Sequence, residues 1–589
     1  MCGIFGIIGR YDSAKVKTSL HKMLNRGPDC SKIVEFKSGC FAQNRLSIIA
    51  PSHKYDPPFT IENKYFIFNG ELYNFKELSP NQTSDSMAAF ELFDSNKESF
   101  LKNANGMFAF ALFNQDTNKL TLVRDRFGKK PLYYTLQDGV FIFASSIDAI
   151  APHITAKFNK EALKSYLSYH APIKQETFYK DIYKVPAGSI LEYDGAKIVV
   201  TKYFELLNEQ EDSKSIEELL FDSINKRLVA DCEVGAFLSG GVDSSTVCAV
   251  ASRFLAQNSK KLQTFCIGYD NFEKDDERYF ANITAKKIGS IHHEIPFSKN
   301  DFLDSLQKCI EAFDEPISDP TAVPYNFLCN AVSQNGIKTV LSGEGGDEAF
   351  LGYSKYEFFA QINNAKKLPF ASYLGGFFER HEEQNREWEW YKRAFSDDIL
   401  YRSMAESSTD RQKIALLNQN VSSQNSATLI KNYYSNFLNS HHSDYSVWMS
   451  YIDIKIWLSE VLLQKADKIG MANSLEIRCP FMEYKVLAKC IKLGDARFAK
   501  TNKLILKNIM NDLLPNEILN RDKKGFSYPF NKWLFEIGDP EVVFELNIKT
   551  QFFHKKYLNF LFNQAKRGSF KHQFWGVYIF SKWYISRFC

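Results

Sequence analysis

Cys2 directly follows the initiator Met, in the opening sequence MCGIFGIIG. If the Met is removed, this single residue carries both a thiol and a free α-amino group. Because the ordinary pKa values of a thiol (about 8.5) and of an α-amine (about 7.7–8.0) lie close together, the amine can act as the base that activates its own thiol. Taken alone, a cysteine at this position is more often an N-terminal residue packed in a strand, so a nucleophilic role needs support from other residues.

Three further positions offer what a cysteine needs to attack an amide, namely donors for the oxyanion and a clamp for the charged end of the substrate. Asn69-Gly70 follows the apolar run Tyr65–Phe68 and offers a side-chain amide and a backbone N–H at a predicted turn. Arg45 can hold a carboxylate bidentately, and Asp85 can hold an ammonium group. Each also has a structural interpretation (a hairpin turn, a surface arginine, a helix N-terminus), so only their combination is informative.

A second candidate site is the glycine-rich segment Ser239–Ser245 (SGGVDSS), between the apolar run Val234–Leu238 and a predicted helix over Ser244–Leu255. Glycines let the backbone approach an anion, and a helix N-terminus offers unpaired N–H groups to phosphate. The segment lacks the Gly-Lys-Ser/Thr ending of a Walker A loop, which argues against γ-phosphate transfer. Asp243 would repel phosphate unless a divalent cation bridged the two, which implies Mg²⁺. The alternative is an ordinary glycine turn that enters a helix.

The first two hundred residues are predicted to be rich in β-strands. Short apolar runs alternate there with the turn signals Asn69-Gly70 and Asp138-Gly139. A helix is expected over Asp85–Phe93. The predicted strands are Tyr65–Phe68, Met107–Phe113, Lys119–Val123 and Val140–Ala144.

The pattern changes after Tyr203, where the polar segment Leu207–Lys214 (LNEQEDSK) indicates a linker. Beyond it, predicted strands alternate with predicted helices, which favours a parallel α/β sheet with ligands at the carboxyl ends of its strands. From about Glu357 onward the pattern is mostly helical. The strands are expected at Val234–Leu238, Leu262–Ile267, His292–Phe297 and Ile337–Ser342, and the helices at Ser215–Val229, Ser244–Leu255 and Asp276–Ile288.

Composition excludes several classes of function. Lys+Arg 73 against Asp+Glu 69 leaves a net charge of +4, which gives no basic footprint for nucleic acid and no polybasic membrane patch. A hydrophobic content of 44% and a charged content of 24% exclude wholesale disorder. Eleven cysteines without a CxxC pair, no long apolar stretch and no convincing signal peptide favour a cytoplasmic protein. We expect small-molecule partners, no nucleic acid and no membrane, and leave a homodimer open.

The motifs of the front half resemble the class II (N-terminal nucleophile) glutamine amidotransferase domain. They occur in the order CGIFG from Cys2, RGPD from Arg26, NRLSI from Asn44, NGELYN from Asn69 and RDRFGKKPLY from Arg124. The resemblance implies a four-layer αββα sandwich that hydrolyses glutamine, with Cys2 as nucleophile and Asn69 and Gly70 as oxyanion hole. The implied glutamine pocket contains Arg45, Leu46, Ser47, Ile48, Ile49, Asn69, Gly70, Glu71 and Asp85.

The sequence departs from that family at three positions. The family usually has His where Asn25 and Gln43 stand, and Glu where Ser146 stands. None of these is the nucleophile or its immediate clamp, so the departures bear on coupling between domains more than on hydrolysis.

The loop Ser239–Ser245 resembles the pyrophosphatase loop of N-type ATP pyrophosphatases, which cleave ATP between the α and β phosphates and adenylate a carboxylate. With later motifs, the similarity to glutamine-hydrolysing asparagine synthetases covers nearly the whole chain. Those motifs are DEP from Asp314, SGEGGDE from Ser342, LQKADK from Leu463, MANSLEIR from Met471, PF from Pro480 and RDKKGF from Arg521 with Trp533.

This resemblance implies a glutaminase domain over 2–206 and, over 207–589, an α/β domain of the adenine nucleotide α-hydrolase type with helical additions. ATP and Mg²⁺ are the implied substrate and cofactor, Asp243 and Asp347 the metal ligands, and Glu344 the general base for ammonia. The implied ATP-binding residues are Leu238, Ser239, Gly240, Gly241, Asp243, Ser244, Ile267, Ser342, Gly343 and Lys465.

The acceptor of the amide nitrogen stays open between two hypotheses. One is the side-chain carboxylate of aspartate, as in an asparagine synthetase, and the other is a different carboxylate, such as a sugar acid of a surface polysaccharide. The motifs do not separate these two because they handle glutamine and ATP. The β-lactam-forming relatives are disfavoured because they have no use for a nucleophilic Cys2. A non-catalytic binding or regulatory descendant is a remote alternative. The sequence speaks against this alternative because it retains all five key residues: Cys2, Asn69, Asp243, Glu344 and Lys465.

Overall fold

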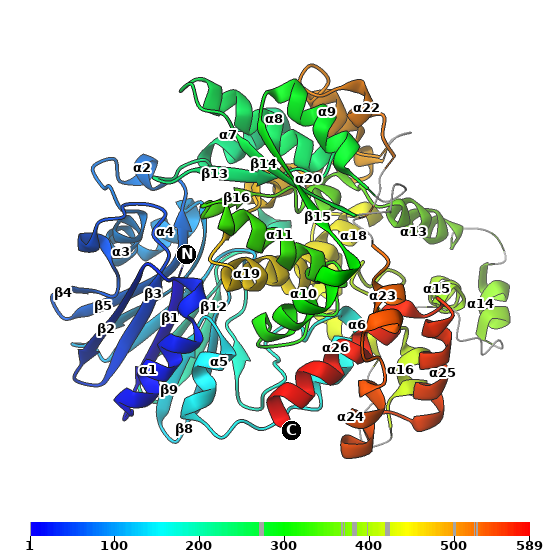
Figure 1. Ribbon diagram of the computed structural model, residues 1–589, viewed down its shortest axis with the longest axis horizontal. Coiled ribbons are helices and arrows are strands. Elements are labelled where there is room, and N and C mark those ends of the chain that lie inside the picture. Colours follow the sequence, from blue (N-terminus) through cyan, green and yellow to red (C-terminus); the bar gives the residue numbers. More distant parts are fainter. Residues whose placement is uncertain are drawn as a thin grey trace.

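The computed structural model describes residues 2–269, 276–366, 369, 371–379, 386–396, 398–418, 425–498, 502–522, 525 and 528–589. Lys523, Lys524 and Phe526, which belong to one of the motifs above, lie outside the described residues. A β-rich sandwich forms the left of the molecule in Figure 1, with the parallel sheet at the upper centre and the C-terminal helices to the right.

Two six-stranded antiparallel sheets build the front half of the chain. The first has the order β10 (Tyr183–Lys184), β8 (Tyr133–Gln137), β9 (Val140–Ala144), β1 (Cys2–Ile8), β3 (Gly39–Arg45), β2 (Cys30–Phe36). The second has the order β12 (Ile198–Lys202), β11 (Ser189–Tyr193), β7 (Lys119–Arg124), β6 (Gly106–Asn114), β5 (Lys64–Leu72), β4 (Phe59–Ile61).

The alternation of side chains along β1 shows why these sheets form layers. Cys2 and Ile4 belong to the core between the two sheets, whereas Phe5 faces the opposite side and stacks on His153, with ring centroids 4.9 Å apart. On β5, Phe66 points away from the other sheet and contacts Phe90, with ring centroids 5.4 Å apart. The helices that cover these outer faces are α1 (Ser13–Lys22) and α5 (Ile147–Ile150) on one sheet, α3 (Asp85–Ser95) and α4 (Lys97–Asn103) on the other; α2 (Phe75–Leu78) and α6 (Ala162–Tyr169) complete this half. The predicted αββα sandwich is therefore confirmed.

The two turn signals of this half have different outcomes. Asp138-Gly139 is the turn of the β8–β9 hairpin, with φ of +50° and +75°. The turn predicted at Asn69-Gly70 is wrong, because β5 continues to Leu72 and Gly70 pairs with Phe108 on β6. A Cβ at Gly70 would lie 2.1 Å from the carbonyl oxygen of Met107, so the glycine serves close strand approach at φ +148° rather than a reversal of the chain.

A five-stranded, wholly parallel sheet forms the core of the back half, as predicted. Its order is β15 (Ile291–Phe297), β14 (Gln263–Tyr269), β13 (Val234–Phe237), β16 (Thr339–Leu341), β17 (Glu476–Arg478). The helix before it starts at a capping box of Ser215 and Glu218. Its accompanying helices are α7 (Ile216–Lys226), α8 (Val242–Ala256), α9 (Arg278–Ile288), α10 (Lys299–Ala312), α11 (Ala322–Gln334), α12 (Gly346–Phe350), α19 (Leu463–Ala472) and α20 (Tyr484–Lys492).

The helical additions pack against both halves. The hydroxyl of Tyr166 on α6 donates to the carbonyl of Gly576 on the last helix, at 2.7 Å. The additions comprise α13 (Ser354–Ala365), α14 (Ala371–Glu379), α15 (Arg386–Ala394), α16 (Asp410–Leu416), α17 (Ser426–Leu438), α18 (Tyr445–Asp453), α21 (Leu504–Ile509), α22 (Asn516–Leu519), α23 (Phe530–Ile537), α24 (Val542–Thr550), α25 (Lys555–Lys566) and α26 (Lys571–Phe588).

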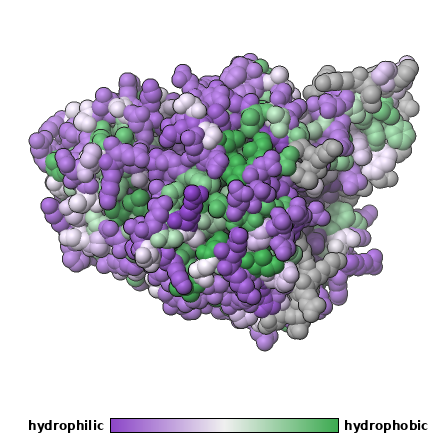
Figure 2. All heavy atoms as spheres, turned by 90° about the horizontal axis from the view of Figure 1, so that it is seen from above, coloured by the Kyte–Doolittle hydropathy of each residue, from purple (hydrophilic) through white to green (hydrophobic). Residues whose placement is uncertain are grey.

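Hydrophilic residues cover most of the face drawn in Figure 2, with apolar residues gathered toward its middle. Within the described parts of the chain, no helix combines the length and the apolar character needed to cross a bilayer.

Candidate functional site

The front site lies where β1 begins and β3 ends, beside β5 of the other sheet. Cys2 and Arg45 are directly opposite each other in the β1–β3 pair. The backbone N–H of Cys2 donates to Oδ1 of Asn69 at 3.0 Å, and the Asn69 amide nitrogen lies 3.4 Å from the Ser145 hydroxyl. Burial raises the pKa of the Cys2 thiol, and the positive charge of Arg45 opposes that shift. The structure thus brings the predicted nucleophile, amide donor and arginine together.

Gln43, which stands where the family usually has His, fixes the strand that carries Asn69. Its side chain donates to the carbonyl of Phe68 at 2.8 Å and accepts from the N–H of Phe68 at 3.3 Å. The amide therefore ties the two sheets together next to Asn69. Ser145, which also accepts from the N–H of Ile4 at 3.1 Å, is a neighbour that sequence reasoning missed.

The Arg45 guanidinium is held by the loop that follows its strand. Its Nη2 donates to the carbonyls of Ile49 and Ala50, at 2.7 and 2.8 Å, and its Nη1 pairs with the carboxylate of Asp56. The segment Leu46–Ile49 is thereby kept beside Cys2. In the same loop, the N–H of Ser47 donates to Asp29, at 2.7 Å.

Two predicted pocket carboxylates differ in their partners. Asp85, at the start of α3, accepts from the N–H of Leu72 at 3.1 Å, and burial raises its pKa to about 6. Glu71 instead pairs across the domains with Arg478, Oε2 to Nη2 3.5 Å, and Arg478 also holds Glu476 at 2.5 Å. Burial and the neighbouring Glu476 raise the pKa of Glu71, while Arg478 lowers it. The Glu71 carboxylate thus belongs to a buried contact between the halves.

Further buried ion pairs join the two halves around α19. Asp467 pairs with Nη1 of Arg26 at 2.9 Å and with Nζ of Lys130 at 3.0 Å. Ser146, a second departure from the family pattern, donates to Asp314 at 3.1 Å. The third departure, Asn25, accepts through its backbone carbonyl from the Ser474 hydroxyl at 2.7 Å. Charges buried in this way need their partners, so the halves are held in one relative placement.

A cavity of about 250 Å³ opens at the carboxyl ends of β13, β14 and β16, which is where a parallel sheet places its ligands. Ten residues singled out in the sequence line it: Leu238, Ser239, Asp243, Ser244, Ile267, Ser342, Gly343, Glu344, Asp347 and Lys465. Gly241 lines an adjoining hollow, and Gly240 accepts through its carbonyl from Arg521 at 3.0 Å. A Cβ at Gly240 would meet Phe280 at 2.5 Å, which explains the glycine at φ +68°. The structure therefore brings the predicted residues of the glycine-rich loop and of the later motifs to one cavity and its adjoining hollow.

The two predicted metal ligands share one ammonium group. Nζ of Lys503 lies 2.5 Å from Oδ1 of Asp347 and also pairs with Asp243. Carboxylate oxygens are the donors that Mg²⁺ prefers, and this pair already faces a single cationic centre, so the residues fit the ion. Lys503 belongs to none of the sequence motifs, and only the folded chain brings it to this position.

Lys465 and Glu344 form the polar end of the cavity. The Lys465 ammonium donates to Asp319 at 2.8 Å and to the Thr321 hydroxyl at 2.9 Å. Glu344 accepts from the thiol of Cys479 at 3.5 Å. Burial raises the pKa of Glu344, and Lys465 lowers it. Asp319, Thr321 and Cys479 were missed, although Asp319 follows the DEP motif closely and Cys479 stands between two others.

Comparison with known proteins agrees with both halves. A model of the glutamine amidotransferase domain matches residues 1–204, and a model of asparagine synthase matches residues 215–585. Asparagine synthetase (glutamine-hydrolyzing) 1 of Bacillus subtilis (strain 168) is 29% identical over 621 residues, which cover 99% of this chain and 96% of that protein. Asparagine synthetase (glutamine-hydrolyzing) 3 of the same strain is 24% identical, over 89% of this chain and 87% of the length of that protein. Asparagine synthetase (glutamine-hydrolyzing) 2 of Oryza sativa subsp. japonica is 32% identical, over 60% of each.

Proposed function

The chain belongs to the asparagine synthase family, and we therefore propose that it is an enzyme that uses glutamine and ATP to convert aspartate to asparagine. The observation that carries this proposal is the pairing of two sites in one chain. Cys2 stands beside Arg45 and Asn69 at one end, and a cavity holding Lys465 and Glu344 lies at the carboxyl edge of a parallel sheet. We place the glutaminase domain at 2–206 and the synthetase domain at 207–589.

In the glutaminase domain, the Cys2 thiolate attacks the side-chain amide carbon of glutamine. With Oδ1 of Asn69 occupied by the Cys2 N–H, the Asn69 amide presents its nitrogen, and together with the N–H of Gly70 it would stabilise the tetrahedral oxyanion. Ammonia leaves with a proton returned by the Cys2 amine, and water then hydrolyses the thioester to glutamate. Arg45 would hold the substrate's α-carboxylate and Asp85 its ammonium group.

In the synthetase domain, the acceptor carboxylate attacks the α-phosphorus of ATP, giving an acyl-adenylate and pyrophosphate. Leu238, Ile267, Ser342 and Gly343 would hold the adenosine, and the backbone N–H groups at the start of α8 would hold phosphate. Lys465 would neutralise the charge that develops on pyrophosphate. Asp243 and Asp347 would hold Mg²⁺, which would supply further charge neutralisation when bound.

Ammonia adds to the acyl-adenylate carbonyl and must lose a proton as AMP leaves, so a general base is required. Glu344 is proposed for this role because it lines the cavity beside Lys465. The groups that face it are Lys465, Asp319, Tyr325 and Cys479.

The raised pKa of Glu344 predicts a pH dependence. The rate at a fixed concentration of free ammonia should fall as the pH falls through this raised pKa, because the protonated acid cannot accept a proton. Since the folded-state pKa lies above the ordinary value, protonation does not destabilise the fold at this group. Glu344→Gln should lower the ammonia-dependent rate by roughly 10²–10⁴-fold and remove this limb of the profile. An unchanged limb in the variant would assign it to another group.

The acceptor is tested by pyrophosphate release with glutamine and ATP-Mg across a panel of carboxylates. We expect release, and formation of the amide, with aspartate. If aspartate gives none while a sugar acid does, the chemistry holds but the acceptor is wrong. If no carboxylate works and glutamine is not hydrolysed, the chain is a binding or regulatory descendant.

A further inference from the structure

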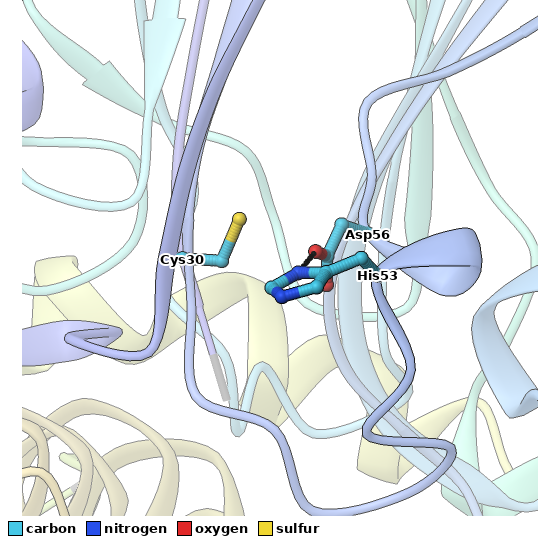
Figure 3. Close-up of side chains that lie close together, drawn as sticks. All are labelled: Cys30, His53 and Asp56. Carbon is cyan, nitrogen blue, oxygen red and sulfur yellow. Dashed lines mark hydrogen bonds and ion pairs between the residues drawn. The ribbon is translucent and has the colours of Figure 1, made fainter.

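A cluster of three different metal-binding side chains lies just outside the glutamine pocket. Figure 3 shows Cys30 reaching from one side, and His53 and Asp56 from the other, toward a common point. One ligand atom from each lies within 4.8 Å of the other two. Cys30 begins β2, His53 begins the short helix η2 (His53–Tyr55), and Asp56 follows that helix. Strand and loop thus converge although Cys30 is distant in sequence from the other two.

The cluster is built around a buried carboxylate and an accessible imidazole. Nδ1 of His53 lies 2.9 Å from Oδ2 of Asp56, whose side chain is 6% exposed while that of His53 is 90% exposed. Oδ1 of Asp56 is occupied by Arg45, which fixes the orientation of the carboxylate. Cys30 lies directly opposite Arg45 in the β2–β3 pair, so both side chains project from the same face. An ion can therefore enter from solvent on the His53 side.

The donor set determines which ion would bind. A thiolate, an imidazole and a carboxylate together suit a borderline divalent cation such as Zn²⁺, whereas Mg²⁺ and Ca²⁺ prefer oxygen donors alone. Three protein ligands leave a fourth tetrahedral position for water. We propose that Cys30, His53 and Asp56 form a binding site for a divalent cation of the zinc class beside the glutamine pocket. Binding would release the thiol proton of Cys30 to solvent.

The site shares Asp56 with Arg45, which links it to glutamine binding. The Arg45 guanidinium is engaged by Asp56 and by the carbonyls of Ile49 and Ala50. A cation on Asp56 would withdraw electron density from that carboxylate and weaken its hold on Nη1 of Arg45. More of the guanidinium would then be available to a substrate carboxylate, so the metal should lower KM for glutamine. This consequence, unlike the metal site itself, rests on the proposed function.

Cobalt is the sharpest probe, because Co²⁺ bound to a thiolate gives a near-ultraviolet charge-transfer band. We would titrate the full-length Cys2→Ala chain with Co²⁺, so that the active-site thiol cannot contribute, and then displace Co²⁺ with Zn²⁺. The charge-transfer band should saturate with one equivalent bound at this site, and Zn²⁺ should abolish it. The added Cys30→Ser change should remove the band, and His53→Ala should weaken binding at least tenfold.

Matched controls are available elsewhere in the chain. Cys232 is partly buried like Cys30, and His21 is exposed like His53. Cys232→Ser and His21→Ala should therefore retain the band, and unfolding midpoints would show that all variants are folded. The proposal is overturned if the folded Cys2→Ala chain gives no charge-transfer band with Co²⁺, or if the band persists in Cys30→Ser.

The kinetic consequence is measured separately in the chain with Cys2 intact. Zn²⁺ at the occupancy found by titration should lower KM for glutamine hydrolysis, and His53→Ala should not show this response. A metal site that binds without changing KM would refute the link to Arg45. Absence of glutamine hydrolysis with and without metal would refute the proposed function while leaving the binding result intact.

Discussion

We expect Cys2→Ala to lose glutamine-dependent amide synthesis while synthesis from added ammonium continues near the parent rate. Removal of a covalent nucleophile typically lowers turnover by a factor on the order of 10⁶, and no other thiol takes part in the proposed glutaminase step. The synthetase cavity lies at the carboxyl edge of a different sheet, so it should still accept ammonia directly. The measurement is amide formation with each nitrogen source, together with glutamate release.

Cys40→Ala is the matched control, because Cys40 is also buried in the same sheet, on β3 opposite Ile7. It should keep both activities if it folds. Loss of ammonium-dependent synthesis in Cys2→Ala, with an unchanged unfolding midpoint, would contradict the division of labour between the two domains. Retained glutamine use would show that Cys2 is not the nucleophile.

The sequence predicted those parts of the sites that lie at the ends of regular elements. Strands were predicted at Val234–Leu238 and Ile337–Ser342, with ligands at the carboxyl ends of the sheet. The loops after these two strands do line one cavity, because the strands are parallel neighbours. The Asn69-Gly70 turn was wrong because the dipeptide signal is local, whereas pairing with Phe108 on β6 decides the conformation. Lys503, far along the chain from Asp243, could not be anticipated because no periodicity or spacing records a contact of that sequence separation.

The contacts made at the three positions that depart from the family pattern are seen only in the folded chain. Gln43 bonds the backbone beside Asn69, Ser146 bonds Asp314, and the Asn25 carbonyl accepts from Ser474. Two of the three contacts cross between the domains. That these positions bear on coupling between the domains stays a prediction.

Arg478 is the last residue of β17, and it and the next residue, Cys479, contact residues of the two candidate sites. Arg478 pairs with Glu71 in the glutaminase domain, and Cys479 donates to Glu344 in the synthetase cavity. Because Arg478 is fully buried among carboxylates, its removal would leave Glu71 and Glu476 uncompensated.

A variant of the synthetase cavity, Lys465→Ala, should have the opposite pattern to Cys2→Ala. Lys465→Ala should lower amide synthesis by about 10²–10³-fold with either nitrogen source, the usual effect of removing one charge-stabilising donor, while glutamine hydrolysis continues. Its ammonium group is positioned by Asp319 and Thr321 inside the cavity, so truncation removes the one Lys ammonium among the residues described as lining that cavity. Pyrophosphate release with aspartate and ATP-Mg, measured beside glutamate release, separates the two effects.

Two further variants make this expectation specific. Asp319→Asn should lower the synthetase rate less than Lys465→Ala does, because it weakens only the group that orients the ammonium. Lys485→Ala, which removes a partly exposed lysine paired with Asp212 on the surface, should change neither activity. If Lys465→Ala releases pyrophosphate at the parent rate, Lys465 does not stabilise the leaving group. If it instead loses glutamine hydrolysis alone, the cavity is coupled to the glutaminase site in a way that the proposed mechanism does not contain.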